Sequence, residues 1–196
     1  MNSSFLQNTS VNQFQIPWNH FVIDNFLPQK QFKKIQKQLC SIVGGYQKRE
    51  NDLFDLNFMF VPDLNLAKFF LSDDFKSFLE ETVQEKLELY EEGLVQLRLM
   101  TPASPAMPPH IDDQEDGRSL VCIYYLSSDW HSDKGGELWL HENNVKTKRE
   151  ESKVIQPLEN RMVLFFADDT NWHSVTKVKN WNRYSIISEW IVQEAQ

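Results

Sequence analysis

Four residues in the second half of the chain have the types and spacing of a metal site with an anion-binding partner. His110 and Asp112 stand two positions apart, and His173 follows far downstream. Two histidines and one carboxylate cover one face of an iron ion and leave the opposite face open. Arg183, ten positions after His173, offers a planar guanidinium that can hold one end of a dicarboxylate. These residue types together predict an iron site beside a dicarboxylate pocket.

The His110–Asp112 pair is a common pattern when taken by itself. The five histidines and the aspartates of this chain would give roughly 0.3 His-x-Asp pairs by chance. The spacing nevertheless suits a metal, because residues i and i+2 of an extended segment point the same way. A lone His173 would ordinarily be a structural histidine at a strand end. Its combination with the pair and with Arg183 favours the metal site.

Arg183 opens an apolar segment, residues 184–192, that should be buried on at least one face. A buried guanidinium needs an anionic partner, because an unpaired buried charge is costly. The far carboxylate of 2-oxoglutarate or a structural Asp or Glu could fill that role, and we expect the former. Ser185 shares the face of Arg183 and could donate to the same carboxylate. Lys177 and Lys179 are alternative cations that we expect to be solvated.

Apolar periodicity predicts helices in the first half of the chain and strands in the second. A strand is expected over residues 20–27, an amphipathic helix over 32–42, and a second helix over 74–90 with Ser72 as its cap. Both helices are expected to cover a sheet. Six later runs predict strands, at residues 93–100, 120–126, 137–141, 162–166, 174–178 and 184–192.

Helices followed by many short strands predict a mainly β protein with flanking α, a double-stranded β-helix (jelly roll) with helices packed outside. We expect a flexible polar arm over residues 1–16 and a single domain over 17–196. Residues 17–92 would give helical support and residues 93–196 the jelly-roll core. The Pro-rich stretch 101–109 is expected to be an irregular loop on the rim of the site, because proline removes ladder donors.

Composition and charge restrict the classes of function. The net charge of −8 disfavours binding to nucleic acid or anionic membranes, which need a basic surface. Cys40 and Cys122 are expected to be thiols in a reducing compartment. The first ten residues do not resemble a signal peptide, and no apolar run reaches the ~20 residues of a membrane-spanning helix. We therefore expect a soluble, cytoplasmic protein of undetermined oligomeric state.

Seven phrases in the second half of the chain resemble, in order, the core of the Fe(II)- and 2-oxoglutarate-dependent oxygenases. The likeness is to the prolyl-hydroxylase group, which includes the oxygen-sensing hydroxylases and their small microbial relatives. Residues 17–27 (PWNHFVIDNFL) also resemble the opening of the microbial members. The matching phrases are Asp116-Gly117-Arg118, Cys122-Ile123-Tyr124-Tyr125-Leu126, Asp129-Trp130, Gly135-Gly136-Glu137-Leu138, Arg161-Met162-Val163-Leu164-Phe165-Phe166, His173-Ser174-Val175 and Arg183-Tyr184-Ser185.

The resemblance implies a cofactor set and a role for each ligand. His110, Asp112 and His173 would bind Fe(II), and Arg183 would pair with the distal carboxylate of the co-substrate 2-oxoglutarate. O2 would be the oxidant, with ascorbate as a candidate reductant. No catalytic residue is expected beyond the metal ligands.

Two further pocket residues follow from the resemblance. Tyr125 matches a tyrosine that hydrogen-bonds the distal carboxylate, and Leu138 would form an apolar wall on a strand that begins at the Gly135-Gly136 turn. The chain also departs from the oxygen-sensing enzymes, which carry a tyrosine about ten positions before the first ligand. Leu99 and Met100 occupy that region here, so the contacts to the 1-carboxylate and to the substrate are left open.

Position along the last predicted strand separates Trp190 from the site. It lies an odd number of residues from Arg183 and should face the opposite way, so it is not assigned to the site. Arg183 itself favours the oxygen-sensing type, because collagen-type prolyl hydroxylases use lysine at this place. The remaining histidines and one acidic pair are expected in loops or on the surface: His20, His131, His141, Glu91 and Glu92.

Four functions remain open at this level. The first is hydroxylation of an unactivated C–H bond of a prolyl residue in a peptide or protein, and the second is the same chemistry on a free amino acid or other small metabolite. The third is a non-catalytic metal- or 2-oxoglutarate-binding jelly roll. The fourth, nucleic-acid demethylation, is disfavoured by the acidic charge and by the absence of a second arginine soon after Arg183.

Overall fold

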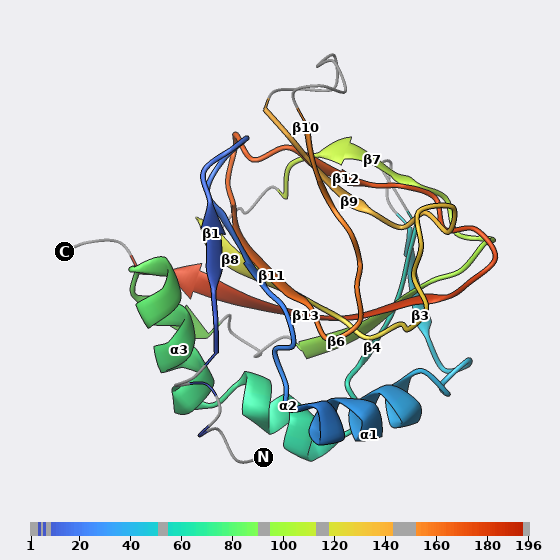
Figure 1. The fold of residues 1–196 in the computed structure, drawn as a ribbon, viewed down its shortest axis with the longest axis horizontal. Helices are drawn as coiled ribbons and strands as arrows, with labels where there is room; N and C mark the ends of the chain where they lie inside the picture. Colours follow the sequence, from blue (N-terminus) through green and yellow to red (C-terminus); the bar gives the residue numbers. More distant parts are fainter. Residues whose placement is uncertain are drawn as a thin grey trace.

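Two antiparallel sheets form the body of the molecule in the computed structural model, which describes residues 4, 6, 9–50, 55–89, 95–112, 118–142 and 152–193 (Figure 1). The larger sheet runs in the order β1 (Asn12–Phe14), β2 (His20–Ile23), β11 (Met162–Ala167), β8 (Ser119–Tyr125), β13 (Arg183–Val192), β6 (Val95–Met100), β4 (Asp55–Phe60) and β3 (Gln47–Glu50), with β5 (Leu87–Leu89) on the end of β13. The smaller sheet runs β10 (Ser152–Ile155), β9 (Leu138–His141), β12 (His173–Val175) and β7 (Met107–His110). The expected jelly-roll class is confirmed.

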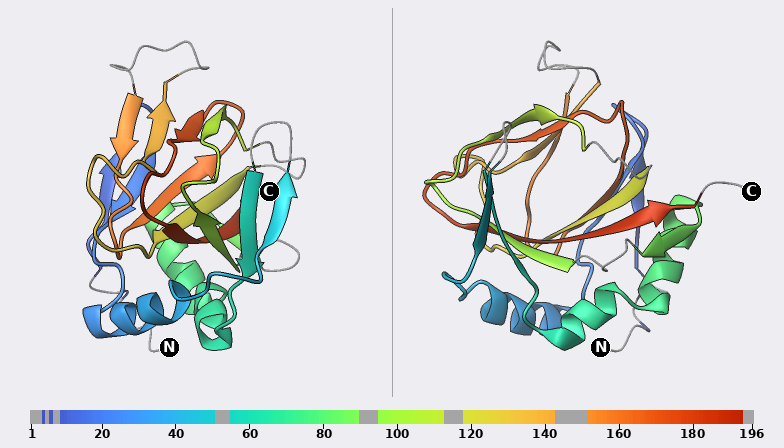
Figure 2. Two further views of the ribbon diagram at one scale, coloured as in Figure 1. Left: turned by 90° about the vertical axis from the view of Figure 1, so that its right-hand side faces the viewer. Right: turned by 180° about the vertical axis from the view of Figure 1, so that it is seen from behind.

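Three helices lie along the outer face of the larger sheet: α1 (Gln29–Leu39), α2 (Leu64–Phe70) and α3 (Asp73–Val83) (Figures 1 and 2). Ser72 caps α3 as expected, because its side chain accepts the N–H of Phe75. Asp63 caps α2 in the same way, through the N–H groups of Asn65 and Leu66. None of the helices in the described ranges is long and apolar enough to cross a membrane.

Alternate residues of the central strands face two separate cores. On β8, Tyr124 points to the helices and packs edge-on against Phe26, within an aromatic-rich outer core. Tyr125 points the other way, into an inner core between the two sheets that also contains Leu138 and Val175. Both cysteines are free thiols. Cys122 is buried in the outer core, and Cys40 is partly buried and packs against that core. The inner core is the part that bears on the predicted site.

Several predicted boundaries are wrong. The helix expected over residues 74–90 ends at Val83, because Gln84 adopts a left-handed conformation, and Leu87 belongs to β5. The strand expected over 20–27 ends at Ile23, and that expected over 174–178 is β12, which begins at His173. The Pro-rich stretch is a loop only up to residue 106, since Met107–His110 form β7. Proline is tolerated there because β7 is an edge strand of the smaller sheet.

The first part of the chain also differs from expectation. Asn12–Phe14, expected in a loose arm, form β1 and pair with β2. Four further elements, α2, β3, β4 and β10, were not predicted from the sequence. His20, expected in a loop or on the surface, is fully buried within β2. Glu91, Glu92 and the Asp116-Gly117 phrase lie outside the described residues.

Candidate metal and co-substrate site

The three predicted metal ligands come together between β7 and β12. His110 ends β7, His173 begins β12, and the two are direct partners across the antiparallel pair, with ring centroids 4.3 Å apart. Asp112 follows β7, and its two carboxylate oxygens lie 3.6 Å from His110 Nε2 and 3.4 Å from His173 Nε2. One ligand atom from each residue falls within a 4.8 Å spread. The geometry is that of a three-ligand site on one face of a cation.

Backbone carbonyls orient both imidazole rings. His110 Nδ1 donates to Pro108 O at 2.7 Å, and His173 Nδ1 donates to Asn171 O at 3.1 Å. A carbonyl can only accept, so each Nδ1 carries the proton and each Nε2 lone pair is directed at the shared point. Outer hydrogen bonds of this kind fix the tautomer and the ring plane of a metal ligand.

Electrostatics keep the carboxylate of the triad ionised. Burial would raise the pKa of Asp112, but the hydrogen bond and charge of His173, with the charge of His110, outweigh it and lower this pKa to about 2. Burial lowers the pKa of His173, but Asp112 outweighs it and leaves this pKa raised. The pKa of His110 is lowered, chiefly by burial and then by the charge of His173. A cation bound here would compete with protons for Asp112 and for the Nε2 atoms of both histidines.

Next to the triad, β13 and β8 carry a second polar group on the same inner face. Ser185 and Tyr125 are direct cross-strand partners, and Arg183 stands two residues before Ser185. The Arg183 side chain is buried, with its guanidinium 4.9 Å from the ring centre of Tyr125 and Nη1 3.7 Å from Met100 Sδ. In the part of the chain that the structure describes, no carboxylate pairs with Arg183. The structural ion pair considered above is therefore absent from these residues.

Three buried polar atoms in this group have no hydrogen-bond partner among the described residues: Arg183 Nε, Tyr125 Oη and Ser185 Oγ. A buried donor without an acceptor costs about 1–3 kcal/mol, and more when it is charged. A carboxylate placed between the three would accept from all of them. The group thus fits the carboxylate at one end of a dicarboxylate.

One apolar residue and a turn of two glycines belong to the proposed surroundings of Arg183. Leu138 is fully buried in the inner core, as its expected place in the wall requires. Gly136, at φ +81°, lies against Arg183, because a Cβ added there would come 3.0 Å from Arg183 Cδ. Gly135, at φ +68°, leaves no room for a side chain either, since its Cβ would meet the carbonyl of Lys177. The Gly135-Gly136 turn therefore lets the chain pass close to the arginine.

The other singled-out residues fall as follows. Trp190 packs in the outer core beside Phe75, on the opposite face from Arg183 as expected. Lys177 and Lys179 are exposed, as expected. His131 is exposed and paired with Asp133. His141 is not a loop residue: it lies in β9, with its two ring nitrogens hydrogen-bonded to Ser152 and Ser174 on the neighbouring strands.

Two charged residues on the metal-facing side were not predicted from the sequence. Arg98 lies directly across from Ser185, and Glu189 lies four residues beyond Ser185 on the same face of β13. Arg98 Nη2 is 4.0 Å from Glu189 Oε1, and Arg98 Nε donates to Gln96 Oε1 at 3.2 Å. The available signal was their even spacing from Met100 and Arg183. Charged residues in a strand are usually solvated, so even spacing alone does not identify them as inward-facing.

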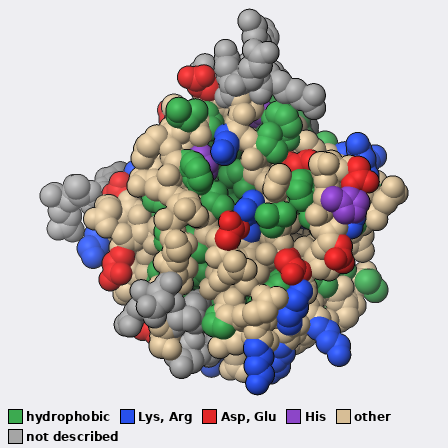
Figure 3. All heavy atoms as spheres, in the orientation of Figure 1, with side chains coloured by type: hydrophobic (Ala, Val, Ile, Leu, Met, Phe, Trp, Pro, Cys, Tyr) green, Lys and Arg blue, Asp and Glu red, His purple; other side chains and the backbone are tan. Residues whose placement is uncertain are grey.

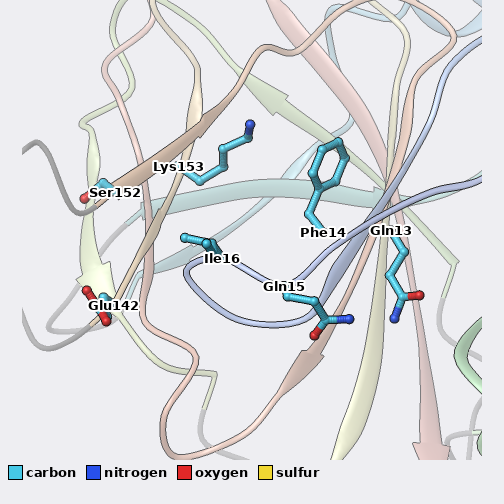
Figure 4. A pocket seen from close by; sticks show the side chains of 7 residues that line it. All are labelled: Gln13, Phe14, Gln15, Ile16, Glu142, Ser152 and Lys153. Atoms are coloured by element: carbon cyan, nitrogen blue, oxygen red, sulfur yellow. The ribbon is translucent and has the colours of Figure 1, made fainter.

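A separate hollow of about 580 Å³ lies between β1 with its following residues and the β9–β10 pair (Figure 4). Residues 13–16, Glu142, Ser152 and Lys153 line it, and Lys153 Nζ stands 5.0 Å from the ring centre of Phe14. None of the three triad residues lines this hollow. It is therefore distinct from the metal and co-substrate site.

Comparison with known proteins places the chain in a family. The model of the 2OG-Fe(II) oxygenase superfamily matches residues 95–192. The prolyl 3-hydroxylase OGFOD1 of Mus musculus is 26% identical over 178 residues, which is 83% of this chain. The chain spans only 30% of that relative's length.

Two solved structures share the fold. A Trichoplax adhaerens prolyl hydroxylase, in complex with a peptide of the oxygen degradation domain of hypoxia inducible factor, is 20% identical, with a TM-score of 0.65 and coverage of 87% of this chain and 82% of that one. A Pseudomonas putida prolyl-4-hydroxylase is 13% identical, with a TM-score of 0.65 and coverage of 98% and 97%. The chain belongs to the 2OG-Fe(II) oxygenase superfamily.

Proposed function

We propose that this protein is a dioxygenase that uses Fe(II), 2-oxoglutarate and O2, and that it hydroxylates a prolyl residue within a peptide or protein. In this proposal His110, Asp112 and His173 hold the iron. Arg183, with Tyr125 and Ser185, holds the distal carboxylate of 2-oxoglutarate, and Leu138 forms an apolar wall of the pocket. The iron, when bound, supplies the oxidation by O2 that places a hydroxyl on carbon while 2-oxoglutarate becomes succinate and CO2.

One observation carries the assignment of the site. Arg183, Tyr125 and Ser185 each have a buried polar atom without a partner among the described residues. They face the inner core, whose Phe165 contacts the proposed ligand His173. Arg183 gives two parallel N–H donors to a carboxylate, and the hydroxyls of Tyr125 and Ser185 add neutral donors at its edge. The resulting fixed position for one end of the co-substrate orients its keto-acid end toward the triad. Protein residues thus supply binding and orientation, and the surrounding inner core excludes water.

The prolyl substrate is supported by the relatives. The mouse relative is named a prolyl 3-hydroxylase, and the Trichoplax structure holds a peptide fragment. On the face seen in Figures 1 and 3, hydrophobic, basic and acidic side chains lie side by side near the middle, a mixture that suits a peptide. The net charge of −8 argues against a nucleic-acid substrate.

A pool of seven-residue peptides with a central proline and randomised flanks tests the proposal across many candidate substrates at once. The Fe(II)-loaded protein should form succinate and add one oxygen to proline in a subset of the pool, as detected by mass spectrometry. Asp112→Ala should abolish both signals, and His131→Ala, an exposed histidine outside the triad, should retain them. If free L-proline or another amino acid is hydroxylated and no peptide of the pool is, the substrate is a small metabolite and the proposed peptide substrate is wrong.

A further inference from the structure

Arg98 and Glu189 form a charged pair on the metal-facing side of the larger sheet. Their side chains are only 24% and 18% exposed, and Arg98 Nη2 lies 4.0 Å from Glu189 Oε1. Arg98 projects from β6 and Glu189 from β13, which pair side by side in the larger sheet (Figure 1). Half-buried charges are rare unless they are paired or serve a ligand.

The pair is close to the metal triad. Glu189 is the direct partner of Val121, which is the partner of Phe165, and the Phe165 ring centre lies 5.0 Å from that of His173. Glu189 is thus linked to the proposed ligand His173 through two steps of strand pairing and one ring contact.

Glu189 is too far along β13 to serve 2-oxoglutarate. Glu189 lies six residues after Arg183, which corresponds to about 20 Å of antiparallel strand. That span is several times the length of a five-carbon dicarboxylate anchored at Arg183. The Arg98 guanidinium reaches toward Glu189, while Arg183 packs on Tyr125 and Met100. Arg98 starts across from Ser185 and its guanidinium reaches toward Glu189, so the pair can contact a second ligand that lies beyond the co-substrate.

An arginine beside a glutamate offers one donor group and one acceptor group at a fixed spacing. In an extended peptide, the N–H and C=O of the same residue point to the same side, and a neighbour can bond to both. Glu189 can accept that N–H while Arg98 donates to that C=O. Proline has no N–H, so the residue that fits cannot be the hydroxylated proline itself.

We propose that Arg98 and Glu189 bind the backbone N–H and C=O of the substrate residue next to the target proline, and so hold the peptide extended across the site. This inference rests on the proposed prolyl-peptide function. Arg98 and Glu189 then determine that a peptide, and not an isolated proline, is positioned for hydroxylation.

The test starts from a peptide of the pool that the protein hydroxylates. This substrate peptide is compared with two ester analogues of the same sequence. In each analogue an ester oxygen replaces the backbone N–H of the residue before or after the proline. With the wild-type protein, one of the two esters should raise KM about tenfold, because a hydrogen bond to a charged acceptor is lost. For the Glu189→Leu variant, the KM of the unmodified peptide should already be about tenfold higher than for the wild type. The ester should raise the KM of this variant by less than a further twofold. Retention of the full ester penalty in Glu189→Leu would overturn the inference.

Binding gives a readout that does not depend on turnover. The labelled peptide is titrated by fluorescence anisotropy into the Zn(II)-loaded protein with 2-oxoglutarate present. Glu189→Leu and Arg98→Met should each weaken peptide binding about tenfold and leave the affinity for 2-oxoglutarate unchanged. Arg118→Met removes a comparable ion pair, 3.1 Å from Glu85, and should leave peptide affinity at the wild-type value.

Failure of the inference is separable from failure of the function. If the wild-type protein hydroxylates no peptide of the pool, the proposed function is wrong. If it does, but the Arg98 and Glu189 variants bind the peptide as tightly as wild type and differ only in melting temperature, the pair is a structural ion pair and the inference is wrong.

Discussion

Gly136 lies directly against the side chain of Arg183, and an added Cβ would approach Arg183 Cδ to 3.0 Å. Because Gly136 also has φ +81°, Gly136→Ala adds backbone strain of about 1–3 kcal/mol to this contact. We expect a lower melting temperature and a several-fold higher KM for 2-oxoglutarate, since Arg183 must shift. Gly44→Ala is the matched control, because an added Cβ there meets nothing within 4 Å. Equal KM values for the two variants would contradict this account.

The metal site should depend on the triad and on no other histidine cluster of the described residues. Asp112→Ala removes the charged ligand, so Mn(II) affinity should fall by about 100-fold or more in a calorimetric titration. His131→Ala should titrate like the wild type, because His131 lies at the surface beside Asp133. Tight Mn(II) binding by Asp112→Ala would place the metal elsewhere.

Arg183 and Tyr125 should affect the co-substrate and not the metal. Arg183→Lys keeps the charge but loses the planar pair of N–H donors that can bind both oxygens of a carboxylate. We expect roughly tenfold weaker 2-oxoglutarate binding. Tyr125→Phe removes one neutral hydroxyl and should cost roughly threefold. Lys177→Ala, which changes an exposed cation near the same strands, should have no effect. The measurement is anaerobic titration of the Fe(II) protein, followed by its visible charge-transfer band.

His20 should make stability depend on pH. Its pKa is lowered, chiefly by burial, and its Nδ1 donates to Trp18 O at 2.8 Å. A folded pKa below the unfolded value of about 6.5 means that the unfolded chain binds more protons, so stability is full above about pH 6.5 and is lost as pH falls through the folded pKa. His20→Gln should show a smaller loss of unfolding free energy between pH 7 and 5 by urea denaturation. If the unfolding free energies of the wild type and of His20→Gln fall equally between pH 7 and 5, His20 is not the source of the pH dependence.

Alternation along strands made much of the site predictable. His110 and Asp112 two positions apart, and Arg183 and Ser185 on one face, follow from the period-2 geometry of extended chain. The distant partner His173 could be proposed only because its residue type completed a ligand set. His173 is the direct partner of His110 on the neighbouring strand. This pairing belongs to the tertiary structure and cannot be read from spacing along the chain.

The errors have local physical causes. Residues 107–109 were assigned to a loop because two prolines cannot donate, yet an edge strand does not need those donors on its outer side. Leu87 continued the helical stripe of α3, but Gln84 in a left-handed conformation ends the helix first. Arg98 and Glu189 were missed because a charge within a strand looks solvated until its neighbours across the sheet are known.

The two faces of β13 also determine how this protein can fail. Arg183 and Ser185 lie on the metal-facing side, while Tyr184 and Trp190 fill the outer core. A slip of one residue in the pairing of β13 would exchange these sets, burying a guanidinium among aromatic rings and removing the co-substrate contacts at once. Chains that fold incorrectly at this strand are therefore inactive and unstable together. In any mutant library, partial activity should report the fraction of correctly folded molecules as much as the quality of each site.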